Sequence, residues 1–182
     1  TLPFEIQHCK TQLDLINFLG LSVFSRNVYS KQDEYWFGGI CEEYFEGVET
    51  FESSIKIGKN EIKNRVYHFN NGILSEELMY VFNESTVVQK KFLIDDFKSQ
   101  AGLFEQFLVS RKWRFNREKF ELISNKVGES GIVIVGDFFS PLKMLHLAMG
   151  PVNSVYFLME QPEFSKALLK LHEKSQLDLI EQ

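Results

Sequence analysis

A buried strand followed by a capped helix, between Gly131 and Gly150, is the feature that most constrains the fold of this chain. Residues 132–135 are Ile, Val, Ile and Val, a run of branched apolar side chains typical of a strand buried on both faces. Ser140 and Pro141 then favour a helix start, because serine caps free N–H groups and proline suits the first helical position. Gly150, followed by a proline, ends this helix. The stretch predicts one β-loop-α unit, and in α/β proteins ligands bind where such a strand ends.

Polar and aromatic side chains gather at this strand end, and five of them are the candidate substrate-binding residues: Asp137, Phe138, Phe139, Ser140 and His146. Asp137 could contact a substrate or simply be favoured by the dipole of the following helix. Ser140 could direct helix N–H groups to a carboxylate or phosphate, or be only an N-cap. The two phenylalanines suit a pocket for a flat ligand, with one of them expected in the core. His146 is either an acid/base or a structural or solvent-facing histidine.

The composition fits one ordinary folded domain. The chain has 182 residues, of which 44% are hydrophobic, enough for a real core. A net charge of −5 argues against nucleic acid or an anionic membrane as a partner. Cys9 and Cys41 are too far apart in the sequence for a Cys-x-x-Cys site, so we predict no metal site and a reduced, cytoplasmic protein. No apolar run reaches ~18 residues and no signal-peptide pattern occurs, so no membrane partner is expected.

Alternation of apolar and polar residues between about 43 and 95 predicts an antiparallel β meander. Asn71-Gly72 favours a tight hairpin turn, and Gly58-Lys59-Asn60 marks another turn. Four strand-like segments are expected, at 48–57, 62–69, 78–82 and 87–94. Such a meander has open edges and is expected to lie against another part of the protein.

Over residues 96–182 the pattern changes to helices, with the strand at 131–139 among them. Asp95-Asp96 and Asn116 suit helix starts, and two further helices are expected from Pro151 and from Pro162. Residues 21–42 are expected to be irregular, and no second strand appears to pair in parallel with 131–139. We therefore expect the chain to be the N-terminal part of a larger α/β domain, or to need a partner.

A set of short motifs between residues 10 and 182 occurs in the order and spacing of a known family. A signature of the form Gly-Phe-x-Gly-x-Pro-aromatic-Thr-hydrophobic keeps its outline at Gly136, Phe138, Pro141, Met144 and Gly150. Further segments agree in order, namely Phe18-Leu19-Gly20, Asn71-Gly72-Ile73-Leu74, Lys91 to Phe97 and Gln161-Pro162-Glu163. On these motifs the chain resembles the uroporphyrinogen decarboxylase superfamily, which includes porphyrinogen decarboxylases and corrinoid-dependent methyltransferases.

The resemblance implies an α/β fold, a distorted (β/α)8 TIM barrel with its active site at the carboxyl ends of the strands. Residues 1–182 would then be the N-terminal part of one such domain. They would supply the meander at about 43–95, the helices of 96–182 and one inner barrel strand at 131–139.

The same resemblance implies the function of a uroporphyrinogen decarboxylase-like protein of porphyrin biosynthesis or a related route, acting as a lyase or a methyltransferase. Arg26 stands alone where decarboxylases carry an arginine-rich loop, and the family's signature tyrosine aligns near His146 or Leu147. A methyltransferase-like or divergent member is therefore favoured over a true decarboxylase. The alternative is a non-catalytic binding or assembly module that keeps the scaffold. The implied ligand is a carboxylated small molecule, a tetrapyrrole or a corrinoid.

No catalytic residue and no cofactor can be assigned within this chain from the resemblance. Zinc or a corrinoid would be implied for a methyltransferase-like protein, with the zinc ligands in a C-terminal half that lies outside the sequence. We expect the chain alone to be inactive. Exposed strand edges and apolar helix faces predict a homodimer or other self-association.

Overall fold

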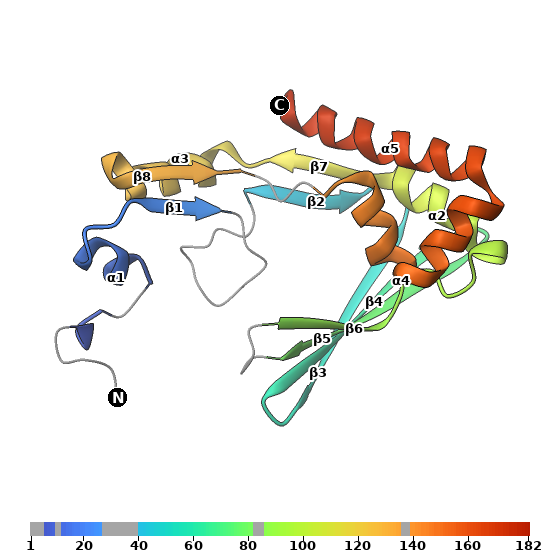
Figure 1. Cartoon of the computed structure of the whole chain (residues 1–182), viewed down its shortest axis with the longest axis horizontal. Coiled ribbons are helices and arrows are strands. Elements are labelled where there is room, and N and C mark those ends of the chain that lie inside the picture. The colour runs from blue at the N-terminus through green and yellow to red at the C-terminus, as the bar shows by residue number, and fades with distance from the viewer. Residues whose placement is uncertain (1–5, 10–11, 27–39, 82–85, 136–138) are drawn as a thin grey trace. The chain divides into compact units, whose positions relative to one another are not determined.

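The structure is a computed structural model of the chain that describes residues 6–9, 12–26, 40–81, 86–135 and 139–182 (Figure 1). The chain forms two compact units. The first unit comprises residues up to 43, residues 113–138 and residue 182, and the second comprises 44–112 and 139–181. Each unit is therefore built from separate segments of the chain.

The first unit contains a parallel pair of strands. Its elements are α1 (Gln12–Phe18), β1 (Val23–Arg26), α3 (Arg117–Val127), the 3-10 helix η3 (Gly128–Ser130) and β8 (Gly131–Ile134). β1 and β8 run side by side in Figure 1, with Val23 beside Gly131 and Arg26 beside Ile134. The expectation that the strand after Gly131 has no parallel partner is wrong, because part of the segment expected to be irregular forms β1.

Two more strands, β2 (Cys41–Phe45) and β7 (Arg111–Phe115), form a second two-stranded sheet. Within the first unit, hydrogen bonds to Glu42 join the beginning of β2 to the end of β7. Arg114 Nε donates to Glu42 Oε2 over 3.2 Å, and Asn116 Nδ2 donates to Glu42 Oε1 over 2.9 Å. These bonds hold the pKa of the Glu42 carboxyl below its usual range, because they stabilise the ionised form.

The second unit is an antiparallel meander covered by helices. Its strands are β3 (Glu49–Ile57), β4 (Asn60–Phe69), β5 (Gly72–Val81) and β6 (Thr86–Lys91), and its helices are α2 (Phe97–Ser110), α4 (Pro141–Glu160) and α5 (Pro162–Ile180). The strands lie in sequence order in one four-stranded sheet. The meander predicted from the alternation is confirmed, since each strand overlaps its predicted segment.

A ladder of charges across the meander reinforces the pairing register. Glu52, Arg65 and Glu76 are directly opposite one another on three neighbouring strands. Arg65 Nε donates to Glu52 Oε2 over 3.1 Å, and Arg65 Nη1 lies 3.6 Å from Glu76 Oε1. A one-residue slip would place these side chains on opposite faces of the sheet, so the ladder favours the observed register.

The hydrophobic core of the second unit lies between one face of the meander and the three helices. Tyr67 and Leu74 project from the sheet into this core, and the ring centroids of Tyr67 and Phe107 lie 5.0 Å apart in an edge-to-face arrangement. Phe104 of α2 and Phe157 of α4 are fully buried in the same cluster. The three helices therefore share one core with the sheet.

α4 is broken at the glycine predicted to end the helix. Gly150 has φ 76° and ψ 163°, outside the helical region, so the predicted stop there is confirmed. A side chain at this position would be strained by the positive φ, and a Cβ would also lie 3.0 Å from the ring of Phe92. Two helical segments at a bend thus cover the sheet in place of one straight helix.

The prediction of a (β/α)8 barrel with an inner strand at 131–139 is wrong. The largest sheet is the antiparallel meander, and β8 belongs to a two-stranded sheet with β1. The described residues contain no succession of parallel strands alternating with helices. The physical reason is that a short apolar run predicts a strand but not its neighbours, and Ile132 in this run is 58% exposed.

We predict that Gly131→Ala disrupts the pairing of β1 with β8. A Cβ at Gly131 would collide with the backbone carbonyl group of Val23, and backbone atoms cannot rotate away as a side chain can. The expected loss is about 1–3 kcal/mol in the free energy of unfolding, measured by urea denaturation followed by circular dichroism.

Gly102→Ala is the matched control, because a Cβ at this position in α2 meets nothing within 4 Å. This change is expected to stabilise the protein by about 0.5–1 kcal/mol, since alanine favours a helix over glycine. Equal stability of the Gly131→Ala variant and the unmodified protein would contradict the observed strand pairing.

Candidate functional site

The candidate site at the end of β8 is described only in part. Asp137 and Phe138 lie outside the described residues. Phe139, Ser140 and His146 are described, and all three belong to the second unit. Phe139 is half-buried, whereas Ser140 and His146 are exposed.

Ser140 is the N-cap of α4. Its Oγ accepts a hydrogen bond from the backbone N–H of Lys143 over 3.2 Å, and Pro141 occupies the first helical turn. The prediction that Ser140 is an N-cap is therefore confirmed. Lys143 also lies close to Phe139, the residue before the cap. Its Nζ is 4.0 Å from the centroid of the Phe139 ring, which is a cation–π geometry.

The backbone carbonyl of Phe139 is held by two side chains of α5. Gln176 Nε2 donates to Phe139 O over 2.8 Å, and His172 Nε2 lies 3.1 Å from the same oxygen. His172 Nε2 also lies 2.9 Å from Gln176 Nε2. With a proton on Nε2, His172 donates to the Phe139 carbonyl; with its proton on Nδ1, Nε2 instead accepts from the Gln176 amide, which also donates to the carbonyl. The entry of the chain into α4 is thus fixed by α5.

His172 is buried, with 4% of its surface exposed. Burial is the main cause that lowers its pKa, because it disfavours the charged imidazolium, and the charge of Arg111 acts in the same direction. The hydrogen bond to the Phe139 carbonyl acts in the opposite direction. The sequence analysis did not single out His172. Its spacing of four from the buried Leu168 was the available signal, since such residues share one helix face.

His146 takes no part in this arrangement. It lies further along α4, and its side chain is exposed. Its surroundings therefore fit the interpretation of a solvent-facing histidine. The structure therefore brings Phe139 and Ser140 together with Lys143, His172 and Gln176, of which the last three were not among the candidate residues.

The described part of the chain contains neither a candidate metal site nor a helix able to span a membrane. No group of three or more His, Cys, Asp or Glu side chains there could hold a metal ion. Cys9 and Cys41 are both free thiols, and burial raises the pKa of the Cys41 thiol. Among the described helices, none is long and apolar enough to cross a membrane.

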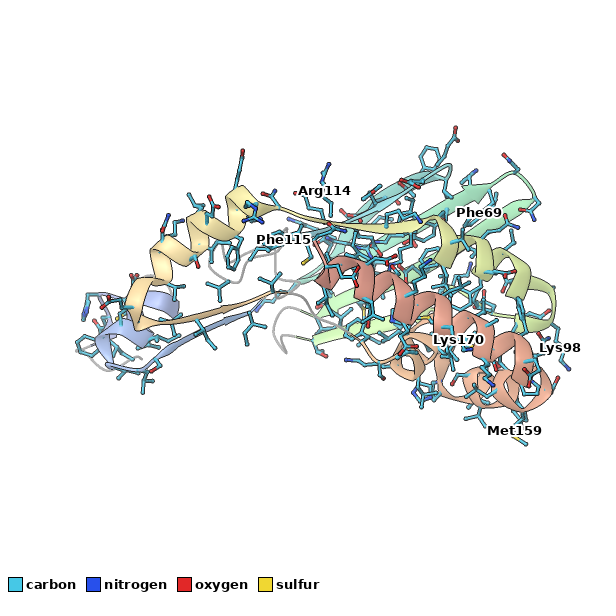
Figure 2. The ribbon with its side chains drawn as sticks, turned by 90° about the horizontal axis from the view of Figure 1, so that it is seen from above. Phe69, Lys98, Arg114, Phe115, Met159 and Lys170 are labelled. Carbon is cyan, nitrogen blue, oxygen red and sulfur yellow. The ribbon has the colours of Figure 1, made fainter. Side chains whose placement is uncertain are left out.

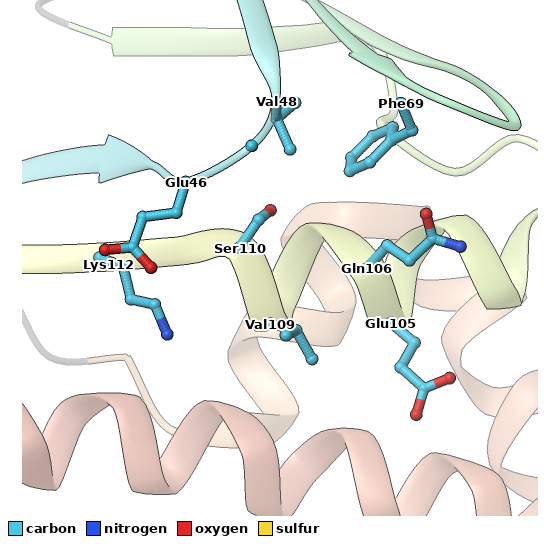
Figure 3. A pocket seen from close by; sticks show the side chains of 9 residues that line it. Glu46, Val48, Phe69, Glu105, Gln106, Val109, Ser110 and Lys112 are labelled. Carbon is cyan, nitrogen blue, oxygen red and sulfur yellow. The ribbon is translucent and has the colours of Figure 1, made fainter.

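An open groove of about 420 Å³ lies in the second unit, and none of the described candidate residues lines it (Figure 3). Val48 and Phe69 line one side, and the outer face of α2 near Val109 lines the other. Charged or amide side chains surround this apolar floor: Glu46, Glu105, Gln106 and Lys112. The backbone N–H of Glu46 donates to Ser110 O over 2.9 Å and closes one end. The sequence carried no motif for this groove, because its residues come from three separate segments.

A stripe of apolar side chains on the second half of α4 is exposed. We call Val152, Val155, Tyr156 and Met159 the α4 stripe; each is at least half exposed, and Met159 reaches 72%. The side chain of Met159 points away from the ribbon in Figure 2. On the opposite face of the same segment Ser154 and Phe157 are fully buried. The helix is thus apolar on both its inner and its outer face, which is unusual for a helix that faces only water.

We predict that the stability of the protein falls as the pH is lowered below about 6.5, the ordinary pKa of histidine. Below this pH, His172 is protonated in the unfolded chain but stays neutral in the folded protein, because burial lowers its pKa. Proton binding therefore stabilises the unfolded state. One such group contributes at most about 1.4 kcal/mol per pH unit. Urea denaturation between pH 7.5 and about pH 5 measures the slope.

His172→Asn removes this group and is expected to flatten the profile while lowering stability at pH 7.5, because contacts with Phe139 and Gln176 are lost. His146→Asn, on the exposed face of α4, is the control and should keep the profile of the unmodified protein. Identical slopes for the unmodified protein and His172→Asn would count against the buried neutral histidine.

Comparison of the chain with protein-family models, with curated proteins and with solved structures finds no match. The resemblance to the uroporphyrinogen decarboxylase superfamily therefore stays a prediction from the order of short motifs.

Proposed function

We propose that this chain is a binding module within a larger assembly, and that the α4 stripe is the surface through which it docks. The observation that carries the proposal is the exposure of four apolar side chains at positions i, i+3, i+4 and i+7 of one helix. Side chains at this spacing lie on one face. This is the pattern by which an amphipathic helix presents anchors to a partner.

The occupant proposed for the α4 stripe is an amphipathic helix of the partner. The inner face of the same segment already packs in this way, since Phe157 contacts Phe164 of α5 with ring centroids 6.2 Å apart. Tyrosine and methionine, both present in the stripe, are enriched at the centres of protein interfaces. Residues 151–160 carry a single charged side chain, Glu160, which is paired with Lys98 over 3.0 Å. A helix with a complementary apolar face fits this surface better than a charged ligand does.

The parallel pair of the first unit supports a larger assembly independently. Parallel strands occur almost only in sheets that are covered on both faces, and two strands alone are marginally stable. β1 and β8 form such a pair, and Ile132 at its surface is more than half exposed. Further polypeptide covering this pair would remove the exposed apolar area.

The second candidate is the uroporphyrinogen decarboxylase-like function, with a carboxylated tetrapyrrole or a corrinoid as ligand. The observation that favours it is the position of the Lys143 ammonium group over the Phe139 ring, next to the capped start of α4. A cation and an aromatic face side by side suit a flat molecule that carries carboxylates. Catalytic groups, and zinc or a corrinoid for methyl transfer, would come from outside this chain.

For the docking function, we predict that Val155→Lys together with Met159→Lys lowers the fluorescence of the apolar dye anilinonaphthalene sulfonate bound to the protein by about half. The free energy of unfolding should change by no more than about 0.5 kcal/mol, because both side chains are exposed. Changing the exposed Lys166 and Lys170 of α5 to Glu is the control and should leave dye binding above that of the stripe variant.

The partner is tested with a photo-crosslinking amino acid placed at Met159 in cells that make the protein, with Lys170 as the control position (both in Figure 2). Crosslinks from position 159 are expected on the apolar face of an amphipathic helix, identified by mass spectrometry. Equal yields from both positions, or products in non-helical segments, would overturn the docking proposal.

For the second candidate, uroporphyrin is the probe, followed by quenching of its fluorescence. Lys143→Ala should weaken binding about tenfold if the ammonium group contacts a carboxylate, and Lys166→Ala on α5 should have no effect. Equal binding by the two variants, or no binding by the unmodified protein, would rule out this site for tetrapyrroles.

A further inference from the structure

β3 is an edge strand that is open along its whole length. It pairs with β4 on one side, and the described strands include no partner on its other side. All nine of its residues are exposed. The register between β3 and β4 runs from Glu49 to Ile57 without a bulge. A long, regular and uncovered edge presents a row of backbone N–H and C=O groups to which another strand can be added.

The charges of β3 are divided between its two ends. Glu49 and Glu52 make the first half acidic, and Lys56, with Lys59 in the following turn, makes the second end basic. An antiparallel copy of the same strand places the acidic half of one chain against the basic end of the other. A parallel copy would instead place like charges side by side. The strand is therefore self-complementary in the antiparallel direction.

The apolar side chains of β3 also favour antiparallel pairing of two copies. Phe51 and Ile55 lie on one face of the strand and are both more than half exposed. In an antiparallel pair centred on Ser53, Phe51 of each copy lies directly opposite Ile55 of the other. Pairs of an aromatic and a β-branched residue at such positions stabilise sheets. On the other face, Glu52 is then diagonal to Lys56 of the second copy.

The sheet behind β3 continues this apolar face. Ile55 lies opposite Ile62 of β4, Ile62 opposite Met79 of β5, and Met79 opposite Val88 of β6. These residues form one row across all four strands. In the proposed pair, this row of each copy continues into Phe51 of the other copy, which adds apolar contact at the junction.

We propose that β3 binds β3 of a second copy of this chain, antiparallel and centred on Ser53, so that two four-stranded meanders form one continuous sheet. The occupant is a second copy because Phe51 and Ile55 pair with each other in the antiparallel direction and the acidic half of one strand then lies along the basic end of the other. This surface is separate from the α4 stripe, and the pairing does not depend on the proposed docking function.

Sedimentation equilibrium tests the pairing. The unmodified protein is expected to dimerise, and Lys56→Glu should raise the dimer dissociation constant about tenfold because it places acid against acid. Lys90→Glu, an exposed position on the opposite edge strand β6, is the matched control and should leave the dissociation constant unchanged, as should the two lysine substitutions in the α4 stripe.

Oxidative crosslinking tests the register. In the proposed pair, Ser53 of one copy lies opposite Ser53 of the other, so Ser53→Cys should form a 53–53 disulfide that mass spectrometry identifies. Thr50→Cys should form no 50–50 disulfide, because residue 50 lies opposite residue 56. The proposal is overturned if the protein stays monomeric up to about 1 mM, if Lys56→Glu has no effect, if Lys90→Glu alone separates the dimer, or if the two cysteine variants crosslink equally.

Discussion

The packing of α2 against one face of the meander is the interaction on which the second unit depends. Tyr67 and Leu74 of the sheet meet Phe104 and Phe107 of α2 in a core that α4 and α5 complete. A meander alone would leave both of its faces in water and could not bury enough apolar surface to be stable. Because the helices cover only one face, the other face and the β3 edge remain exposed. The surfaces available for partners follow from this one-sided packing.

The helices are positioned relative to one another by polar contacts as well as by the core. His172 and Gln176 of α5 hold the Phe139 carbonyl just before α4 begins, and the Ser140 cap fixes the first turn. A buried carbonyl without a donor would cost about 1–3 kcal/mol, so these contacts stabilise one path of the chain. The ring of Phe139 and the ammonium group of Lys143 are presented together as a result.

The exposed apolar groups of the two units fit a protein that works in contact with other polypeptides. The α4 stripe, the Phe51–Ile55 face of β3 and the uncovered parallel pair β1–β8 all expose branched or aromatic side chains. Single exposed apolar residues are ordinary on protein surfaces, but ordered rows at helix or strand spacing are not. Two different surfaces, one helical and one at a strand edge, would allow two different partners at once.

Local features of this chain could be predicted from its sequence because they depend on neighbouring residues. The alternation in residues 48–69 and the Asn71-Gly72 pair indicated the meander, although the turn itself is formed by Asn70 and Asn71 and Gly72 begins β5. Ser140 and Asn116 indicated helix starts that the structure confirms as caps. The stop at Gly150 followed from a residue that tolerates positive φ.

The features that were mispredicted or missed depend on residues far apart in the chain. The run at 132–135 indicated a strand, but its partner is β1, more than a hundred residues earlier, and no local pattern identifies such a neighbour. The groove between β4 and α2 and the contacts of His172 likewise join distant segments. The sequence by itself determined the strands of the meander, the starts of α3 and α4 and the break at Gly150, because these depend on backbone geometry and capping over a few residues. Only the tertiary structure decided which strands pair, which histidine is buried and which apolar faces stay exposed, because burial is shared among segments that meet only when the whole unit packs.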